Sequence, residues 1–191
     1  MPMAATTKKP AMTPSAEAGP IVEVDDRRSG VGGSGEPAAE LGAELAAELA
    51  ALLSAVLLAE GAPAHATAGL HLVDVAEISE LNDEHMGVSG PTDVLSFPLD
   101  GPGDHDGPGP DQDVQQIVGD VVLCPDVAVA QASEHAGSKA DECRLLVVHG
   151  GLHLCGWDHA EPDDRDAMWA RERALMAQLG VSPSGDPWVE T

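Results

Sequence analysis

Three histidines lie close together near the end of the chain, in the segment HGGLHLCGWDH that runs from His149 to His159. His149 and His153 are four residues apart, so both project from one face of a helix, about 6 Å apart at Cβ. Gly156 lets the chain turn after this helix, so that His159 can return toward the pair. Three neutral imidazoles and a water molecule form the open tetrahedral site of a catalytic zinc. The spacing therefore predicts one Zn²⁺ per chain, held by His149, His153 and His159, and chemistry carried out through that metal.

The residue after the first histidine narrows the chemistry of this site. Zinc proteases of the HExxH type carry a glutamate there as general base, but this chain has Gly150. A peptidase of that type is therefore not expected. Bound zinc can still lower the pKa of a water molecule toward about 7 and polarise a phosphoryl or carbonyl oxygen.

Two questions about the site stay open from the residues alone. Three imidazoles with an open position also suit Ni²⁺, Co²⁺ or Cu²⁺. Asp158, beside the third histidine, is expected either to act in the site by orienting an imidazole or to cap a helix.

Apolar periodicity predicts the elements that position these histidines. Alternating apolar residues predict four strands, and apolar spacings of three and four with capping residues predict five helices. The strands are expected at 21–25, 67–73, 92–97 and 114–123, and the helices at 37–60, 74–85, 125–137, 140–154 and 162–179. This order indicates an α+β fold, a small mixed sheet of about four strands packed with about five helices.

Composition divides the chain into a single domain with flanking segments. Residues 1–20 are rich in Pro, Ala and Thr and are expected to be disordered. Residues 21–180 are expected to form the folded domain, and residues 181–191 a flexible tail. The Gly, Pro and Asp content of residues 99–113 predicts a long solvated loop.

The charge is strongly acidic, with 33 Asp and Glu against 9 Lys and Arg and a formal net charge of −24. No basic residue lies between Ser29 and Ser138, which argues against non-specific nucleic-acid binding. No apolar run approaches the roughly 20 residues that span a bilayer, and no secretory signal is visible in the first 20 residues. We therefore expect a cytoplasmic protein without a membrane partner.

The histidine segment resembles the HGxLHLxGYDH signature of the YbeY family of bacterial endoribonucleases, and its continuation is similar to actinobacterial members. PTDVLSFP, at residues 91–98, and GDVV, at residues 119–122, resemble two further motifs of that family in the same order. The resemblance extends over about residues 21–180. It implies a zinc-dependent endoribonuclease specific for single-stranded RNA, with the metal on the three histidines.

The resemblance also implies a role and partners. The family acts in 16S rRNA 3′-end maturation, ribosome biogenesis and ribosome quality control, so single-stranded rRNA is the expected substrate. Small-subunit ribosomal proteins and an assembly GTPase are possible partners. Ser96 and Asp120 lie in two of the matched motifs and are expected to bind substrate, although Asp120 could equally face solvent on the polar side of its strand.

This chain departs from the family pattern at a basic position. Met86 stands where the family commonly has an arginine shortly before PTDVLSFP. Losing a cation near a scissile phosphate weakens stabilisation of the transition state. Arg165, Arg171 and Arg173 on the last helix are expected either to pair with Asp164, Asp166 and Glu172 or to contact RNA phosphates.

Two other functions fit the same residues. A non-catalytic, zinc-stabilised assembly factor would use its acidic surface to bind a basic ribosomal protein, or an assembly GTPase, and Met86 favours this reading. A zinc hydrolase acting on a small ester or amide is the third hypothesis, because activated water is a general reagent.

Overall fold

A computed structural model describes residues 19–28, 42–99 and 116–188. Its sheet contains β1 (Ile21–Asp26), β2 (Thr67–Leu72), β3 (Val94–Pro98) and β4 (Ile117–Leu123), in the order β1-β2-β4-β3. The pairs β1–β2 and β2–β4 are parallel, and β3 is antiparallel to β4. The expected small mixed sheet is confirmed.

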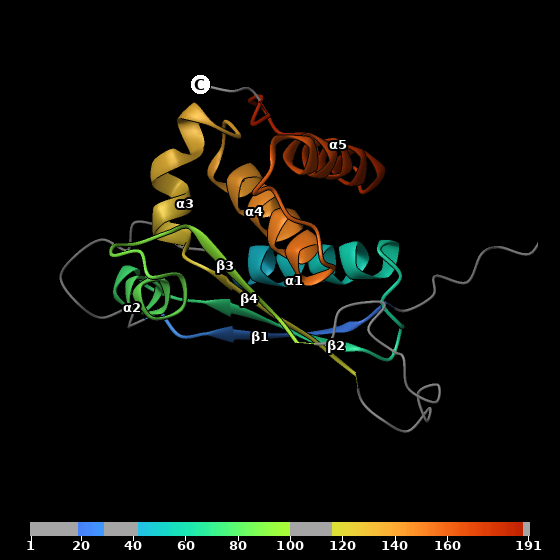
Figure 1. Cartoon of the computed structure of the whole chain (residues 1–191), viewed down its shortest axis with the longest axis horizontal. Coiled ribbons are helices and arrows are strands. Elements are labelled where there is room, and N and C mark those ends of the chain that lie inside the picture. Colours follow the sequence, from blue (N-terminus) through green and yellow to red (C-terminus); the bar gives the residue numbers. More distant parts are fainter. Residues whose placement is uncertain (1–18, 29–41, 100–115, 189–191) are drawn as a thin grey trace, which may run out of the picture.

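Five α-helices accompany the sheet, as expected for the α+β class. They are α1 (Ala43–Ala59), α2 (Val75–Met86), α3 (Pro125–Gln131), α4 (Lys139–Leu154) and α5 (Pro162–Gln178). Figure 1 shows α1 and α4 over one side of the sheet, with α5 beyond them. On the other face, Ile78 and Leu81 of α2 cluster with Leu95 and Val122. The remainder of that second face, which carries Asp25 of β1, the half-buried His71 of β2 and Asp120 of β4, is called the polar face below.

Local chemistry explains both ends of α2. The Asp74 side chain accepts hydrogen bonds from the backbone N–H groups of Ala76 and Glu77, which fixes the start of α2. Gly87 then ends α2 in the left-handed conformation. Residues 1–18, 29–41 and 100–115 lie outside the described part of the chain. With them lie most of the segment predicted to be disordered, the start of the predicted 37–60 helix and most of the predicted 99–113 loop.

One predicted helix is wrong in its length. Residues 125–137 were expected to form a single helix, but α3 ends at Gln131 and a 3-10 turn (Ala132–Glu134) follows. The buried Glu142 accepts a hydrogen bond from the backbone N–H of Ala136, and Gly137 adopts φ +93°. These two features turn the chain away from the helical path.

Close packing fixes α4, the helix that carries His149 and His153, between the sheet and α1. A Cβ on Gly150 would lie 2.9 Å from Val121 Cγ1 and 3.0 Å from Ser96 Oγ. A Cβ on Gly151 would lie 2.9 Å from Leu53 Cδ1 of α1. The two glycines therefore let α4 approach the sheet on one side and α1 on the other, because no side chain separates the backbones. Gly150, where a zinc protease has glutamate, faces the sheet.

The residues after α5 pack onto the domain. We expected residues 181–191 to form a flexible tail, and in the structure Val181 and Trp188 pack against a cluster that includes Met168, Leu175 and Met176. Residues 189–191 lie outside the described part. Among the described helices, none is long and apolar enough to cross a membrane.

Candidate metal centre

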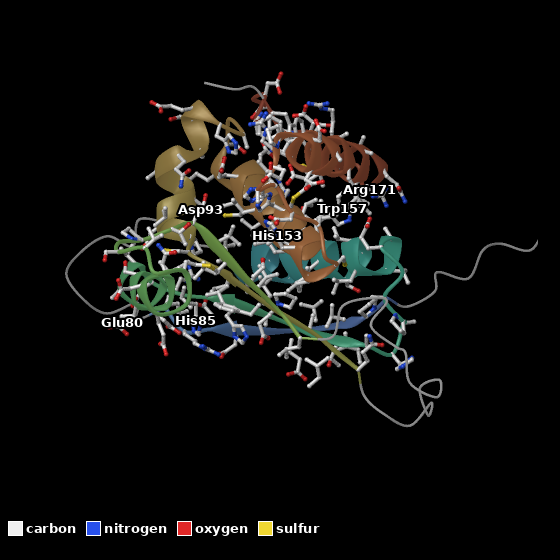
Figure 2. All side chains as sticks on the ribbon, in the orientation of Figure 1. Glu80, His85, Asp93, His153, Trp157 and Arg171 are labelled. Atoms are coloured by element: carbon white, nitrogen blue, oxygen red, sulfur yellow. The ribbon has the colours of Figure 1, made fainter. Side chains whose placement is uncertain are left out.

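The three histidines of the sequence motif come together at the C-terminal end of α4. His149 and His153 lie on the helix, and His159 follows the turn that ends it. One ring nitrogen from each residue lies within 4.8 Å of the other two, and the Nε2 atoms of His149 and His153 are 3.1 Å apart. His149 and His153 are half-buried and His159 is exposed. The group is thus open to solvent on one side, and Figure 2 labels His153 on its helix.

The turn after α4 returns His159 to the pair. Gly156 adopts φ +87°, and the backbone N–H of Trp157 donates to the carbonyl of Leu152. This is the expected use of a glycine just beyond a helix. Asp158 accepts a hydrogen bond from the backbone N–H of His159 at 2.7 Å. The structure therefore places Asp158 on the backbone of the turn, and the contact it gives Asp158 is not to an imidazole.

Two of the imidazoles are oriented through their Nδ1 atoms. His153 Nδ1 lies 2.8 Å from the carbonyl oxygen of Trp157, and a carbonyl oxygen only accepts, so Nδ1 carries the proton. His149 Nδ1 lies 2.5 Å from Oε1 of Glu172, a carboxylate that accepts in the same way. In each ring the Nε2 lone pair is then left free toward the other histidines. Such outer partners fix the tautomer and orientation of metal-binding histidines.

The electrostatics of the group also suit a metal. Burial, reinforced by the neighbouring His149, lowers the pKa of His153 to about 4. His153 is therefore neutral at pH 7, which is the form that binds a metal. Burial raises the pKa of the nearby Cys155 to about 12. That residue stays a protonated thiol, whereas a thiolate is needed to bind zinc.

Glu172 is the part of the site that the sequence pattern did not predict. It was expected on the surface of the last helix as a partner for arginine, but it is 3% exposed and contacts His149. The sequence spacing indicates its burial, because Glu172 lies four residues after Met168 and four before Met176, on the buried side of α5. A carboxylate on the apolar side of a helix indicates a specific buried partner.

The two residues expected to bind substrate lie on opposite faces of the sheet. Ser96 of β3 is half-buried beneath α4, and its hydroxyl donates to the carbonyl oxygen of Gly150 at 3.1 Å. Asp120 of β4 lies on the polar face, where Oδ1 is 3.1 Å from His71 Nε2. The structure brings Ser96 next to the helix turn that carries His149. It does not bring Asp120 to the histidines.

The arginines near the site are engaged by other side chains. Arg171 pairs with Glu60 at 2.7 Å, and Glu60 also accepts a hydrogen bond from the indole of Trp157 at 2.9 Å. Both Arg171 and Trp157 are labelled in Figure 2. Arg165 pairs with Asp166 at 3.5 Å, and Arg173 stacks over the Trp188 ring at 4.8 Å. The expected pairing of arginine with Glu172 is therefore wrong, because that carboxylate is used by His149.

Three arginines elsewhere in the described part are also paired. Arg27, Arg28 and Arg144 each form an ion pair with a carboxylate at 2.6–3.2 Å. Met86, in the last turn of α2, is 50% exposed and supplies no charge. The described arginines therefore bring little unpaired positive charge to the histidine group.

The sequence of this chain is similar to those of one family of known proteins. Residues 37–180 match the family model described as Endoribonuclease YbeY. A Salinispora tropica protein named endoribonuclease YbeY is 47% identical over 112 residues, which is 56% of this chain and 69% of the relative. A Micrococcus luteus protein with the same name is 40% identical over 127 residues, 65% of this chain and 78% of the relative. A solution structure from Thermotoga maritima is 24% identical, covers 88% of this chain and 100% of its own, and has a TM-score of 0.47.

Proposed function

Because the chain belongs to the YbeY family of endoribonucleases, we propose that it is a zinc-dependent endoribonuclease specific for single-stranded RNA. The observation that carries the proposal is the convergence of three imidazole nitrogens within 4.8 Å, two of them in rings whose Nδ1 atoms are already engaged. Its proposed substrate is the 3′ end of 16S rRNA, and its proposed role is in ribosome biogenesis and ribosome quality control in the cytoplasm.

The donor set fits zinc. His149, His153 and His159 would hold the ion, and three protein ligands with an open position are typical of catalytic zinc. Bound there, the ion would supply an activated water and positive charge beside a phosphoryl oxygen. The absence of a glutamate beside His149 supports phosphodiester over peptide cleavage, since Gly150 is packed against Val121 and Ser96. Ni²⁺, Co²⁺ and Cu²⁺ are outcomes to be distinguished by metal analysis.

The other site residues expected from the sequence have smaller roles in this proposal. Ser96 supports the turn of α4 that carries His149, and it is the candidate for a substrate contact on the helix-covered face. Asp120 would contact only a molecule bound to the polar face, and Asp158 would shape the turn that presents His159. We propose residues 21–180 as the nuclease domain, with residues 1–20 and 181–191 as extensions.

Cleavage of RNA with and without a duplex tests the proposal. The zinc-loaded chain is expected to cut a single-stranded precursor of the 16S rRNA 3′ end and to leave the duplex form intact. His153→Ala removes a ligand and is expected to lower the rate by about 100-fold or more, since the metal supplies several kcal/mol of charge stabilisation. His71→Ala, a histidine on the polar face, is the matched control and should cut normally. Equal rates for His153→Ala and the parent would overturn the proposal.

A second function is favoured by the engaged arginines and by Met86. With a net charge of −24 and little free positive charge in the parts of the chain described, a non-catalytic assembly factor bound to a basic ribosomal protein or an assembly GTPase is the alternative. Met86→Arg separates the two functions. A nuclease should cut about tenfold faster with a cation restored near the phosphate. Zinc bound without cutting, in both the parent and Met86→Arg, would support the assembly factor.

A further inference from the structure

A chain of hydrogen bonds connects the end of the described chain to the histidine group. The indole N–H of Trp188 donates to Glu172 Oε2 at 3.0 Å. The other oxygen of that carboxylate, Oε1, lies against His149 Nδ1. Trp188 lies eight residues beyond the region that matches the family model, which ends at residue 180. The family match therefore does not account for this contact.

The two neighbours of Glu172 must both donate. An indole nitrogen has a proton and no lone pair for accepting. His149 must carry its proton on Nδ1 if its Nε2 is to point a free lone pair toward His153 and His159. Among side chains of this length, only a carboxylate offers an acceptor to both, because the amide of glutamine has one oxygen and one donating NH₂ group.

We propose that Trp188 and Glu172 are a positioning pair, in which the indole fixes the carboxylate and the carboxylate holds His149 as the Nδ1–H tautomer with Nε2 free for the metal. The inference rests on the proposed metal site. It assigns the segment after α5 a role in that site, with Trp188 and Glu172 acting through His149 and not on the substrate.

Other residues of the segment after α5 hold Trp188 in place. The carbonyl oxygen of Pro187 lies 3.2 Å from His135 Nε2, and the backbone N–H of Gly185 donates to the carbonyl of Ala136 at 2.8 Å. A Cβ on Gly185 would lie 2.2 Å from the carbonyl oxygen of His135, so the two backbones are in close contact. Arg173 over the indole ring closes the other side. Together these contacts hold the tryptophan next to Glu172.

A Glu172→Gln variant tests the inference, because the glutamine amide cannot accept hydrogen bonds from both Trp188 and His149. With Trp188 present, its oxygen would face the indole and its NH₂ would face His149, which would then have to accept at Nδ1 and move its proton to Nε2. Removing the indole N–H allows the amide to turn its oxygen to His149. The loss of zinc affinity caused by Glu172→Gln should therefore be smaller when the indole N–H of Trp188 is also removed.

The experiment measures zinc affinity by chelator competition and the His149 tautomer by ¹⁵N NMR of the metal-free full-length chain. Glu172→Gln is expected to weaken zinc binding about 10- to 100-fold, as for other outer partners of metal-binding histidines. Trp188→Phe keeps the ring and removes the donor, and we expect a loss of about threefold to tenfold from one hydrogen bond. The double variant should bind zinc no more weakly than Glu172→Gln alone. Trp169→Phe is the matched control, since Trp169 also stacks with an arginine on α5, and it should bind zinc as the parent does.

The tautomer readout separates positioning from mere packing. The Nδ1–H form of His149 is expected in the parent and the Nε2–H form in Glu172→Gln. Unchanged zinc affinity in both single variants, losses that multiply in the double variant, or an unchanged tautomer in Glu172→Gln would each overturn the inference. A chain that binds zinc but cuts no RNA would contradict the proposed nuclease and leave the positioning pair testable. If the parent bound no zinc, the proposed function would fail, and the tautomers of the metal-free chain would still decide the inference.

Discussion

The two faces of the sheet each hold histidines in contact with carboxylates, but the ring atoms are used differently. On the helix-covered face, Glu172 and a backbone carbonyl engage the Nδ1 atoms of His149 and His153, and the two Nε2 atoms face each other, 3.1 Å apart. On the polar face, Nε2 of His71 contacts Asp120 at 3.1 Å and Nδ1 contacts Arg27 at 3.0 Å. Both ring nitrogens of His71 are therefore occupied. A histidine whose Nδ1 is engaged and whose Nε2 faces other imidazoles is placed to bind a metal, whereas His71 has both nitrogens held by charged side chains.

On each face of the sheet, a glycine allows other groups to pack directly against its backbone. Gly150 lets α4 lie against Val121 and Ser96, whereas Gly69 lies under the His71–Asp120 pair, and its Cβ would be 2.1 Å from Asp120 Oδ1. The side chains that contact these two glycines differ in how easily they can move. Val121 is fixed within the core, but the Asp120 and His71 side chains are partly exposed and can move.

The largest loss of stability is expected from a substitution where α4 packs on the sheet. Gly150→Glu would recreate the glutamate of a zinc protease, but its Cβ would be 2.9 Å from Val121 Cγ1. We expect a loss of about 3 kcal/mol or more in the free energy of unfolding, from overpacking and from burying a charge. Urea denaturation of the metal-free chain measures it. Gly42→Glu, with nothing within 4 Å of its Cβ, is the control. A stable Gly150→Glu variant would contradict the close contact.

An intermediate effect is expected on the polar face. Gly69→Ala should displace Asp120 from His71 and lower the free energy of unfolding by about 1 kcal/mol, because the clashing atoms are the ends of side chains. The same urea measurement gives the value, and zinc stoichiometry should not change. If this variant cost as much as Gly150→Glu, the distinction between a rigid and an adjustable face would be wrong.

The smallest effect is expected from the exposed ion pair at the edge of this face. The Arg27 side chain holds the pKa of Asp25 below its ordinary value. A carboxylate with a lowered folded-state pKa stabilises the fold above its unfolded-state pKa, and this contribution is lost as the pH falls through the folded-state value. Asp25→Asn should therefore be slightly less stable than the parent at pH 7, with the difference vanishing at low pH and shrinking in high salt. A difference that grows in acid would contradict this sign.

Features that depend on local spacing were predictable from the sequence. The cap at Asp74, the turn at Gly156 and the histidine spacing on α4 each involve residues within a few positions of one another. Backbone geometry alone places such groups. That is why the order of the elements and the meeting of His149, His153 and His159 could be derived before the structure.

Features that depend on tertiary contacts were not predictable in the same way. Alternation showed that Asp120 and Val121 face opposite ways, but the packing of Gly150 on Val121 decides which face is covered. Glu172 meets His149 from another helix, 23 positions away in sequence. Trp188 falls within residues 181–191, which the sequence predicts as a flexible tail. Each of these needs the packing of two elements that sequence periodicity does not specify.

The most direct test of the account is the metal itself, measured by elemental analysis and zinc-edge X-ray absorption on the same preparation. We expect one zinc per chain with three imidazole nitrogens at about 2.0–2.1 Å and an open or water-filled fourth position. Zinc should be lost in His153→Ala and retained in His71→Ala. A parent chain that retains no zinc, or a His153→Ala variant that binds it unchanged, would contradict the central claim.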